Sequence, residues 1–232
     1  MSKPARETDE YLPALRFRAL TPLFDGVVRT TMREQRFKAM LLDQAELRPG
    51  QRVLDLGCGT GTLALMAAER EPGLEVVGLD ADPEILARAR GKAAAAGAEI
   101  QFDQGLSTDL PYEDESFDRV CSMLFFHHLK PADKRRTAAE VARVLRPGGQ
   151  LHVADFGPPG DPLMHAAFLI VRLFDGREET QEHLNGRLPS IFEEGGLSEA
   201  STHASLRTFM GRLYLYRAEA AARASGQGTP AT

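Results

Sequence analysis

The feature that most constrains the fold is a repeated alternation of strand-like and helix-like segments along the middle of the chain. Strand–helix units of this length place successive strands parallel to one another, joined by right-handed crossovers. The sequence therefore predicts an α/β fold with a doubly wound, mostly parallel sheet. The predicted strands are 52–56, 75–79, 99–103, 117–123 and 150–156, and the predicted helices are 62–69, 82–96 and 133–145.

Three regions lie outside this alternation. Residues 1–45 are predicted to form a helical N-terminal cap, residues 46–220 the main domain, and residues 221–232 a disordered tail rich in Gly, Ala, Ser and Pro. After the fifth strand, residues 163–174 are apolar almost all round, which predicts a buried helix or a lid helix.

The end of the main domain carries two further strand-like runs, 198–204 and 208–217, separated by Ser205-Leu-Arg. Such a short connection favours antiparallel pairing. The predicted sheet therefore has seven strands, with the last one antiparallel. A turn is also predicted at Arg146-Pro-Gly-Gly, directly before the fifth strand.

Composition excludes several classes of function. The chain has 28 Lys plus Arg against 33 Asp plus Glu, a net charge of −5, so a basic nucleic-acid-binding surface is not expected. No apolar stretch is long enough to span a bilayer, and no secretory signal is apparent. Cys58 and Cys121 are too few for a disulfide framework or a cysteine zinc site. We expect a cytoplasmic protein without a membrane span or a nucleic-acid partner.

A glycine-rich turn joins the first predicted strand to the first predicted helix, reading Asp55-Leu-Gly57-Cys-Gly59-Thr-Gly61. Glycines let the backbone approach a ligand in conformations that other residues avoid. Asp80 ends the second strand, at the separation expected of an acceptor for ribose hydroxyls. Ligands of open α/β sheets bind at the carboxyl ends of the strands. The pattern predicts a nucleoside-containing cofactor rather than a mere tight turn.

Two common nucleotide motifs do not fit this turn. Thr62 stands where a dinucleotide fingerprint has its third glycine, which disfavours a nicotinamide-dependent dehydrogenase. No Gly-Lys-Ser/Thr follows, which excludes a triphosphate-binding P-loop.

From about residue 41 to 151 the chain resembles the class I S-adenosylmethionine-dependent methyltransferases. Four motifs carry the resemblance: the turn beginning at Val53, Val77-Gly-Leu-Asp80, Leu110-Pro-Tyr-Glu-Asp-Glu-Ser-Phe-Asp118, and Leu145-Arg-Pro-Gly-Gly149. The chain is most similar to the small-molecule branch that includes enzymes of ubiquinone and menaquinone biosynthesis. The resemblance weakens beyond the fifth strand, where substrate choice usually lies.

The resemblance implies cofactor-binding roles at the first two strand ends. Gly57, Gly59 and Gly61 would pass under the methionine part of S-adenosylmethionine. Asp55 would support the turn and face the positive end of the cofactor, and Asp80 would accept hydrogen bonds from both ribose hydroxyls.

The next two strand ends are also implied in cofactor binding. Ala81 would lie against the adenine, and the backbone of Ser122 would contact the methionine end. Leu106 and Ser107 occupy the positions where the family usually has Asp-Ala, so the acid that meets the adenine amino group is missing. Either the backbone of these two residues or Asp109 would take its place.

Methyl transfer needs mainly in-line alignment of nucleophile, methyl group and sulfur. A general base is needed only for an acceptor that arrives protonated. His127 and His128, which follow the fourth strand, are the candidate bases, with His128 slightly favoured; the alternative is that they cap the loop. Asp155, ending the fifth strand, is interpreted as an acceptor for the backbone of the Pro- and Gly-rich loop that follows, ahead of a substrate-orienting role.

Metal-dependent relatives place acids at the ends of both the fourth and the fifth strand, whereas here the fourth ends in Ser122-Met123, so no metal is predicted. Candidates for the acceptor pocket, each with core packing as the alternative, are Phe24, Phe125, Phe126, His165 and Phe168. The helix face formed by Arg29, Arg33 and Arg36 is interpreted as a solvated face; the alternative is that one arginine meets a carboxylate of the cofactor or substrate.

The sequence therefore predicts an enzyme that moves a methyl group from S-adenosylmethionine to a small, partly apolar organic acceptor by in-line displacement. The nucleophilic atom is left open among O, N, C and S, and so is the oligomeric state. The alternative is a noncatalytic cofactor-binding module or accessory subunit. A protein or RNA methyltransferase is disfavoured by the charge and by the missing amino-methylation motif.

Overall fold

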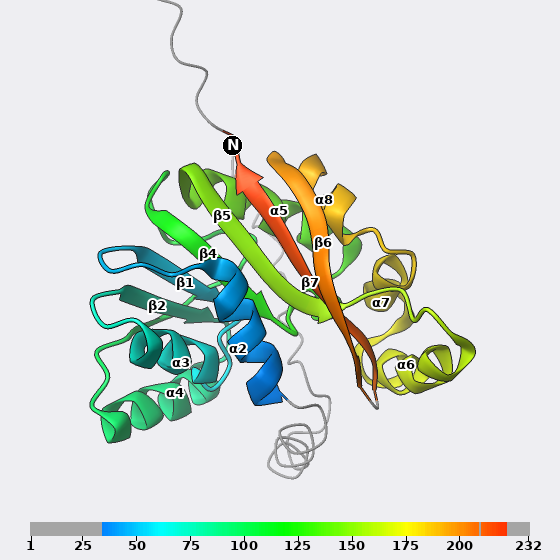
Figure 1. Cartoon of the computed structure of the whole chain (residues 1–232), viewed down its shortest axis with the longest axis horizontal. Coiled ribbons are helices and arrows are strands. Elements are labelled where there is room, and N and C mark those ends of the chain that lie inside the picture. The colour runs from blue at the N-terminus through cyan, green and yellow to red at the C-terminus, as the bar shows by residue number, and fades with distance from the viewer. Residues whose placement is uncertain (1–33, 209, 222–232) are drawn as a thin grey trace, which may run out of the picture.

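A seven-stranded sheet forms the centre of the molecule in the computed structural model, which describes residues 34–208 and 210–221 (Figure 1). The strand order is β3-β2-β1-β4-β5-β7-β6. The pairs among β1 to β5 are parallel, and β7 runs antiparallel to both β5 and β6. This confirms the predicted doubly wound sheet with an antiparallel last strand. The strands are β1 (Arg52–Leu56), β2 (Glu75–Asp80), β3 (Gln101–Gln104), β4 (Phe117–Met123), β5 (Leu145–Phe156), β6 (Leu197–Thr208) and β7 (Gly211–Ala220).

Helices cover both faces of this sheet, with α2 on the near side in Figure 1 and α5 behind it. One apolar core joins the sheet to α5 and α8, and a second joins its other face to α2, α3 and α6. The alternation of side chains along each strand supplies both cores: Val53 packs in the second and its neighbour Leu54 in the first. The helices are α2 (Glu34–Ala45), α3 (Thr62–Arg70), α4 (Pro83–Ala96), η2 (Phe126–His128), α5 (Pro131–Val144), α6 (Pro162–Asp175), α7 (Arg177–Leu184) and α8 (Leu188–Glu194).

The predicted turn before the fifth strand is wrong. Strand β5 already begins at Leu145, which pairs with Phe117, and the ladder resumes where Arg119 pairs with Gln150. The residues between form an irregularity within the strand pairing and not a turn that precedes it.

The predicted position of the last hairpin turn is also wrong. Strand β6 continues to Thr208 and β7 begins at Gly211. Leu206 lies opposite Leu213, which is fully buried. This apolar cross-strand pair keeps the predicted turn segment Ser205-Leu-Arg within the hairpin's strand pairing.

The segment between β5 and β6 carries α6, α7 and α8. Helix α6 confirms the helix predicted at 163–174; among its residues whose burial is described, Met164, Phe168 and Val171 are buried and Leu163, Leu169 and Leu173 are exposed. Helices α7 and α8 have no counterpart among the predicted elements.

Only part of the predicted N-terminal cap is described, as α2, on which Arg36 is exposed. Phe24, Arg29 and Arg33 lie outside the described residues, as does the predicted tail from residue 222 onward.

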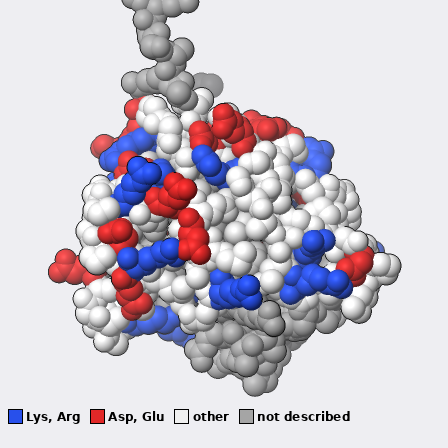
Figure 2. Space-filling model, in the orientation of Figure 1, with Lys and Arg blue, Asp and Glu red and all other residues white. Residues whose placement is uncertain are grey.

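Surface charge on the face shown in Figure 2 is of mixed sign, with basic and acidic side chains interleaved and a largely uncharged centre. Among the residues that the structure describes, no helix is both long enough and apolar enough to cross a membrane.

Candidate cofactor-binding and catalytic site

The glycine-rich turn between β1 and α3 is held in a conformation that suits glycine. Gly57, Gly59 and Gly61 have φ angles of 71°, 53° and 68°, in the left-handed region. The backbone N–H groups of Gly57 and Cys58 donate to the carbonyl of Leu79 at 2.9 and 3.0 Å. The turn is therefore fixed to the end of β2.

Asp80 makes a second connection between the turn and β2. Its Oδ2 accepts from the backbone N–H of Gly59 at 2.9 Å, and its Oδ1 accepts from that of Asp82 at 3.0 Å. Each carboxylate oxygen has a further lone pair for another donor. These two backbone hydrogen bonds fix the orientation of the Asp80 carboxylate and leave it able to accept hydrogen bonds from hydroxyl groups.

The three glycines differ in what surrounds them. A Cβ on Gly59 would meet no heavy atom within 4 Å, whereas a Cβ on Gly57 would lie 2.3 Å from the ring of Phe125. A Cβ on Gly61 would lie 2.8 Å from the ring of Phe102. The turn is therefore packed against protein at Gly57 and Gly61 and open at Gly59.

Asp55 lies beneath the turn and is almost completely buried. Its Oδ2 accepts from the backbone N–H of Ala64 in the first turn of α3, at 2.9 Å. Burial raises the pKa of Asp55 to about 7, and the positive charge of the buried Lys38 on α2 opposes that rise. Asp55 supports the turn from below.

The raised pKa of Asp55 predicts a pH-dependent stability. The folded state binds more protons than the unfolded state between pH 4 and 7, so this residue makes the free energy of unfolding fall as pH rises, by at most about 1.4 kcal/mol per unit. Asp55→Asn keeps an acceptor for Ala64 and should remove that slope. Urea unfolding of both proteins at pH 5 to 8 measures it; parallel curves would contradict the prediction.

The ends of β2 and β3 are joined beside Asp80. The backbone N–H of Gly105 donates to the carbonyl of Asp80 at 3.1 Å, and the side-chain amide of Gln104 donates to the carbonyl of Ala81 at 3.2 Å. The predicted adenine-binding positions after β2 and β3 are therefore neighbours.

Among the groups that were predicted to replace the missing adenine-binding acid, the backbone carbonyl of Leu106 has a partner within its own turn. The Ser107 hydroxyl lies 2.8 Å from that of Thr137, away from solvent, and the carbonyl of Leu106 accepts from the backbone N–H of Asp109. The side chain of Leu106 is 42% exposed. This edge of the site therefore presents an apolar side chain.

Ser122, near the end of β4, is buried, and its hydroxyl donates to the carbonyl of Leu56 at 2.8 Å. This bond ties the end of β4 to the start of the glycine turn. Two residues on, Leu124 has a φ of 53° and donates its N–H to the carbonyl of Ala154 on β5. The chain therefore turns sharply where it leaves the sheet.

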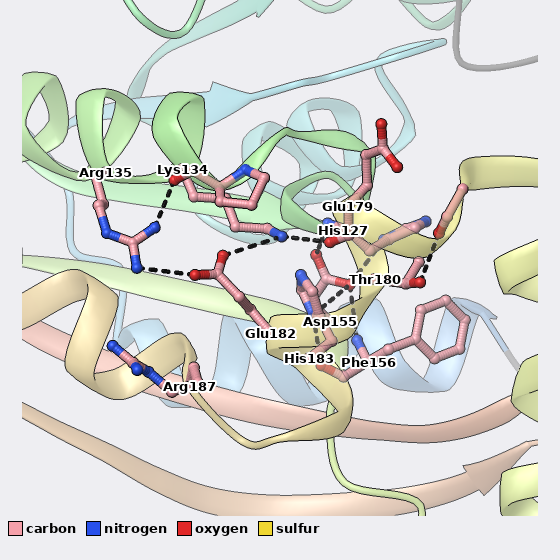
Figure 3. A network of polar contacts seen from close by, with 12 residues as sticks. His127, Lys134, Arg135, Asp155, Phe156, Glu179, Thr180, Glu182, His183 and Arg187 are labelled. Atoms are coloured by element: carbon pink, nitrogen blue, oxygen red, sulfur yellow. Dashed lines mark hydrogen bonds and ion pairs between the residues drawn. The ribbon is translucent and has the colours of Figure 1, made fainter.

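His127 and Asp155 form a buried pair at the ends of β4 and β5 (Figure 3). His127 Nδ1 lies 2.8 Å from Asp155 Oδ1. The carboxylate also accepts from the backbone N–H groups of His127 and Phe156, at 3.3 and 2.7 Å. Asp155 thus accepts from backbone at η2 and within β5, and not from the Pro- and Gly-rich loop as predicted, and it additionally orients an imidazole.

The charge state of Asp155 is set by this environment. Burial would raise the pKa of Asp155, but the two neighbouring imidazoles of His127 and His183 and the hydrogen bonds to the carboxylate hold it well below its usual range. An ionised Asp155 fixes the orientation of His127. The other candidate base, His128, is half-buried, with its ring centroid 4.0 Å from that of His127.

A further polar cluster behind this pair was missed by the sequence reasoning. Lys134 on α5 is fully buried and reaches Glu182 on α7, and His183 on the same helix lies beside Asp155 (Figure 3). One signal was available: Lys134 precedes Thr137, Ala138 and Val141 on the apolar face of its helix, where a lysine needs a buried partner.

Of the residues predicted to line an acceptor pocket, Phe125 and Phe126 meet edge to face with ring centroids 5.8 Å apart, and Phe24 lies outside the described residues. Phe126 and Phe168 are fully buried and belong to different apolar cores, so the core interpretation applies to them. His165 is exposed on α6. Of these residues, as far as the structure describes them, Phe125 is the one that contacts the glycine turn, at Gly57.

The glycine turn, the carboxylate of Asp80 and the imidazole of His127 lie along the carboxyl edge of the sheet. Ligands of this fold class bind at that edge. Within residues 34–208 and 210–221, no group of three or more His, Cys, Asp or Glu side chains is placed to hold a metal ion.

Comparisons with known proteins place this architecture in a family. Residues 53–149 match a methyltransferase domain family. A demethylmenaquinone methyltransferase of Thermus thermophilus is 41% identical over 145 residues, which are 62% of this chain and 65% of that protein. An uncharacterised methyltransferase of Synechocystis is 33% identical over 170 residues, 73% of this chain and 77% of that protein.

A solved structure agrees at the level of the fold. The crystal structure of YcgJ from Bacillus subtilis superposes with a TM-score of 0.67 at 21% identity, covering 81% of this chain and 99% of that one. This chain belongs to the S-adenosylmethionine-dependent methyltransferases.

Proposed function

We propose that this chain transfers a methyl group from S-adenosylmethionine to a small, partly apolar organic acceptor. The observation that carries the proposal is the hydrogen bond from Gly59 to Asp80, which joins the open glycine turn to an acceptor for ribose hydroxyls at one strand edge. The chain covers 65% of the Thermus relative, which is a demethylmenaquinone methyltransferase. This similarity supports an aromatic, partly apolar acceptor here.

The residues present suit the cofactor. We assign the ribose hydroxyls to Asp80, which retains free lone pairs, and the methionine part to the open backbone at Gly59. Gly57, Gly61 and Asp55 hold the turn in shape beneath it. When bound, S-adenosylmethionine supplies an electrophilic methyl group on a positively charged sulfur.

Residues that follow the ends of β2, β3 and β4 are assigned the remaining contacts with the cofactor. We assign the faces of the adenine to Ala81 and to the exposed side chain of Leu106, and the methionine end to the backbone of Ser122. Ser107 supports this edge through Thr137. Apolar contact replaces the acid that the family usually has at the adenine edge.

We assign the general base to His127 ahead of His128. The carboxylate of Asp155 lies 2.8 Å from Nδ1 of His127 and holds the ring in one orientation, which is how a histidine that acts as a general base is commonly held. His128 is half-buried with its ring beside that of His127, which suits a contact with the acceptor.

Incubation with methyl-labelled S-adenosylmethionine and a panel of quinols, phenols, amines and thiols tests the activity. We expect label on a quinol or phenol. Binding of S-adenosylmethionine without transfer to any member of a panel extended by proteins would favour the noncatalytic alternative.

Asp80→Ala should weaken binding of S-adenosylmethionine and S-adenosylhomocysteine by about 1–3 kcal/mol, because it leaves buried hydrogen-bonding groups unpaired. Titration calorimetry measures the change. The matched control is Asp82→Ala, which removes the N-cap of α4 two residues away, where Oδ1 accepts from Glu84 at 2.8 Å. The control should lower stability by about 1 kcal/mol without changing affinity. Equal affinities in wild type and Asp80→Ala would refute the ribose assignment.

A further inference from the structure

The loop between β3 and β4, residues 105–116, carries Leu106, to which we assign a face of the adenine. Within the loop, Leu106 and Asp109 form an isolated bridge, in which the N–H of Asp109 donates to the carbonyl of Leu106 at 3.2 Å. At its start, the N–H of Gly105 donates to the carbonyl of Asp80. Backbone groups that no strand or helix pairs need partners on other elements.

Helix α5, which lies behind the sheet in Figure 1, supplies such partners through a carboxylate and a guanidinium that bind one residue of the loop. Glu140 Oε2 accepts from the backbone N–H of Leu110 at 2.7 Å, and Arg143 Nη2 donates to the carbonyl of Leu110 at 3.0 Å. Both main-chain polar groups of this buried leucine are therefore bound by α5. We call Glu140 and Arg143 the loop clamp.

The two side chains of the loop clamp also hold each other. Arg143 Nε lies 2.9 Å from Glu140 Oε1, and Arg143 Nη2 lies 2.7 Å from Glu140 Oε2. This two-pronged contact fixes the plane of the guanidinium, which the point charge of a lysine would not do. The hydrogen bonds from Arg143 hold the pKa of Glu140 below its usual range, so Glu140 binds the loop as a charged acceptor.

Contacts from the same side of α5 extend along the loop in both directions. Towards β4, Arg143 Nη1 donates to the carbonyl of Tyr112 at 2.7 Å and to Asp114 Oδ1 at 2.9 Å. Towards β3, the hydroxyl of Thr137 lies 2.8 Å from that of Ser107. Thr137 and the two residues of the loop clamp are spaced three positions apart, so they lie along one side of the helix.

The loop clamp acts close to Leu106. Leu110 directly follows Asp109, which is bridged to Leu106. The turn between Leu106 and Asp109 is therefore tied to the carbonyl of Asp80 at one end and to the loop clamp at the other. The side chain of Leu106 is 42% exposed, and its position follows from the backbone that carries it.

We propose that Glu140 and Arg143 are positioning residues for the cofactor: by binding the peptide groups of Leu110, they hold Leu106 against the adenine. This inference rests on the proposed function, because it uses the adenine position assigned there. The acid that usually meets the adenine amino group is missing, so affinity at this edge depends on where the apolar side chain of Leu106 lies. The loop clamp determines that position.

Two ligands that differ in the base separate this role from general support of the fold. S-adenosylhomocysteine carries the adenine, and S-ribosylhomocysteine has a hydroxyl group in its place. In Arg143→Met we expect about tenfold weaker binding of the first ligand and a change below about twofold for the second, because only the contact with the base is displaced. Calorimetry measures the first affinity, and competition against S-adenosylhomocysteine measures the second.

A second variant and a control complete this comparison. Arg143→Lys keeps the charge but cannot bind Glu140 and Leu110 in the same fork, so it should change the ratio of the two affinities in the same direction, and it carries the test if Arg143→Met does not fold. The control is Arg146→Met, which removes an arginine bound to Asp118 at 2.6 Å and should leave both affinities unchanged. An equal loss for both ligands, or the same change in the control, would overturn the inference.

A double-mutant cycle tests whether the loop clamp acts through Leu106. Leu106→Ala should weaken binding of S-adenosylhomocysteine in the wild-type background. It should add nothing once Arg143 is replaced, because Leu106 has then already moved away from the adenine. Two losses that simply add would mean that the loop clamp acts on another part of the site, contrary to the proposal.

Hydrogen exchange of the ligand-free protein distinguishes failure of this inference from failure of the proposed function. The amides of Asp109 and Leu110, which donate to Leu106 and Glu140, should exchange faster in Arg143→Met than in the wild type. If they do so but the wild type binds no S-adenosylhomocysteine, the proposed function is refuted and the hold of the loop clamp on the loop stands. Normal binding by the wild type with unchanged exchange in Arg143→Met would overturn the inference and leave the proposed function intact.

Discussion

His127→Ala should lower kcat by about 100-fold or more, the usual contribution of a positioned general base. The imidazole is only 4% exposed and its Nδ1 is bound by Asp155 at 2.8 Å, so the structure holds it in one orientation. Affinity for S-adenosylhomocysteine should not change, because the glycine turn and Asp80 are untouched. Initial rates with a quinol or phenol acceptor from the labelling panel, combined with calorimetry, measure both quantities.

Two further variants define what the result means. His203→Ala, an exposed position on β6, is the matched control and should retain full turnover. His128→Ala should lower kcat less than His127→Ala does. A larger effect at His128 would move the base to that residue, and full turnover in both variants would show that alignment alone suffices for this acceptor.

Gly57→Ala should lower the free energy of unfolding by several kcal/mol. The residue has a φ of 71°, and an added Cβ would lie 2.3 Å from the ring of Phe125. A left-handed conformation costs an L-residue about 1–2 kcal/mol, and overpacking adds about 1–3 kcal/mol. Urea unfolding measures the loss. A change below 1 kcal/mol would mean that Phe125 moves aside freely.

Gly59→Ala is the matched comparison, because it combines the same kind of backbone with free space. Its φ is 53° and no heavy atom lies within 4 Å of an added Cβ, so only the conformational cost of about 1–2 kcal/mol should appear in the unfolding measurement. The methyl group would instead project into the space that we assign to the cofactor. S-adenosylhomocysteine should therefore bind more weakly to this variant, and equal affinity would place the cofactor elsewhere on the turn.

Local patterns made the first half of the fold predictable. Strand β1 runs from Arg52 to Leu56 and β4 from Phe117 to Met123, as predicted, because each is a short apolar run with clear boundaries. Helix α7 was missed because the face that it buries is polar. Its buried residues are Thr180 and His183, which hydrogen-bond partners stabilise where apolar periodicity is lacking.

The candidate site likewise has parts that the sequence predicted and parts that it did not. The glycine turn and Asp80 belong to one strand–helix–strand unit, so their proximity followed from chain order. The pairing of His127 with Asp155 joins residues 28 positions apart, and it depends on how the loop after β4 turns. Ser107 was assigned to the adenine edge through its backbone, and its hydroxyl binds Thr137 on α5, a partner 30 positions away that no local pattern reveals.

The position of β7 has a consequence for how the chain is made. This strand is the last one described, yet it pairs between β5 and β6, which precede it. During synthesis, the edge of β5 that pairs with β7 therefore stays unpaired while α6, α7, α8 and β6 are being made. Non-local pairing of this kind is slow and leaves exposed edges in the meantime. Because the carboxylate of Asp155 sits at the end of β5, the catalytic centre that we propose is completed only when the hairpin of β6 and β7 closes.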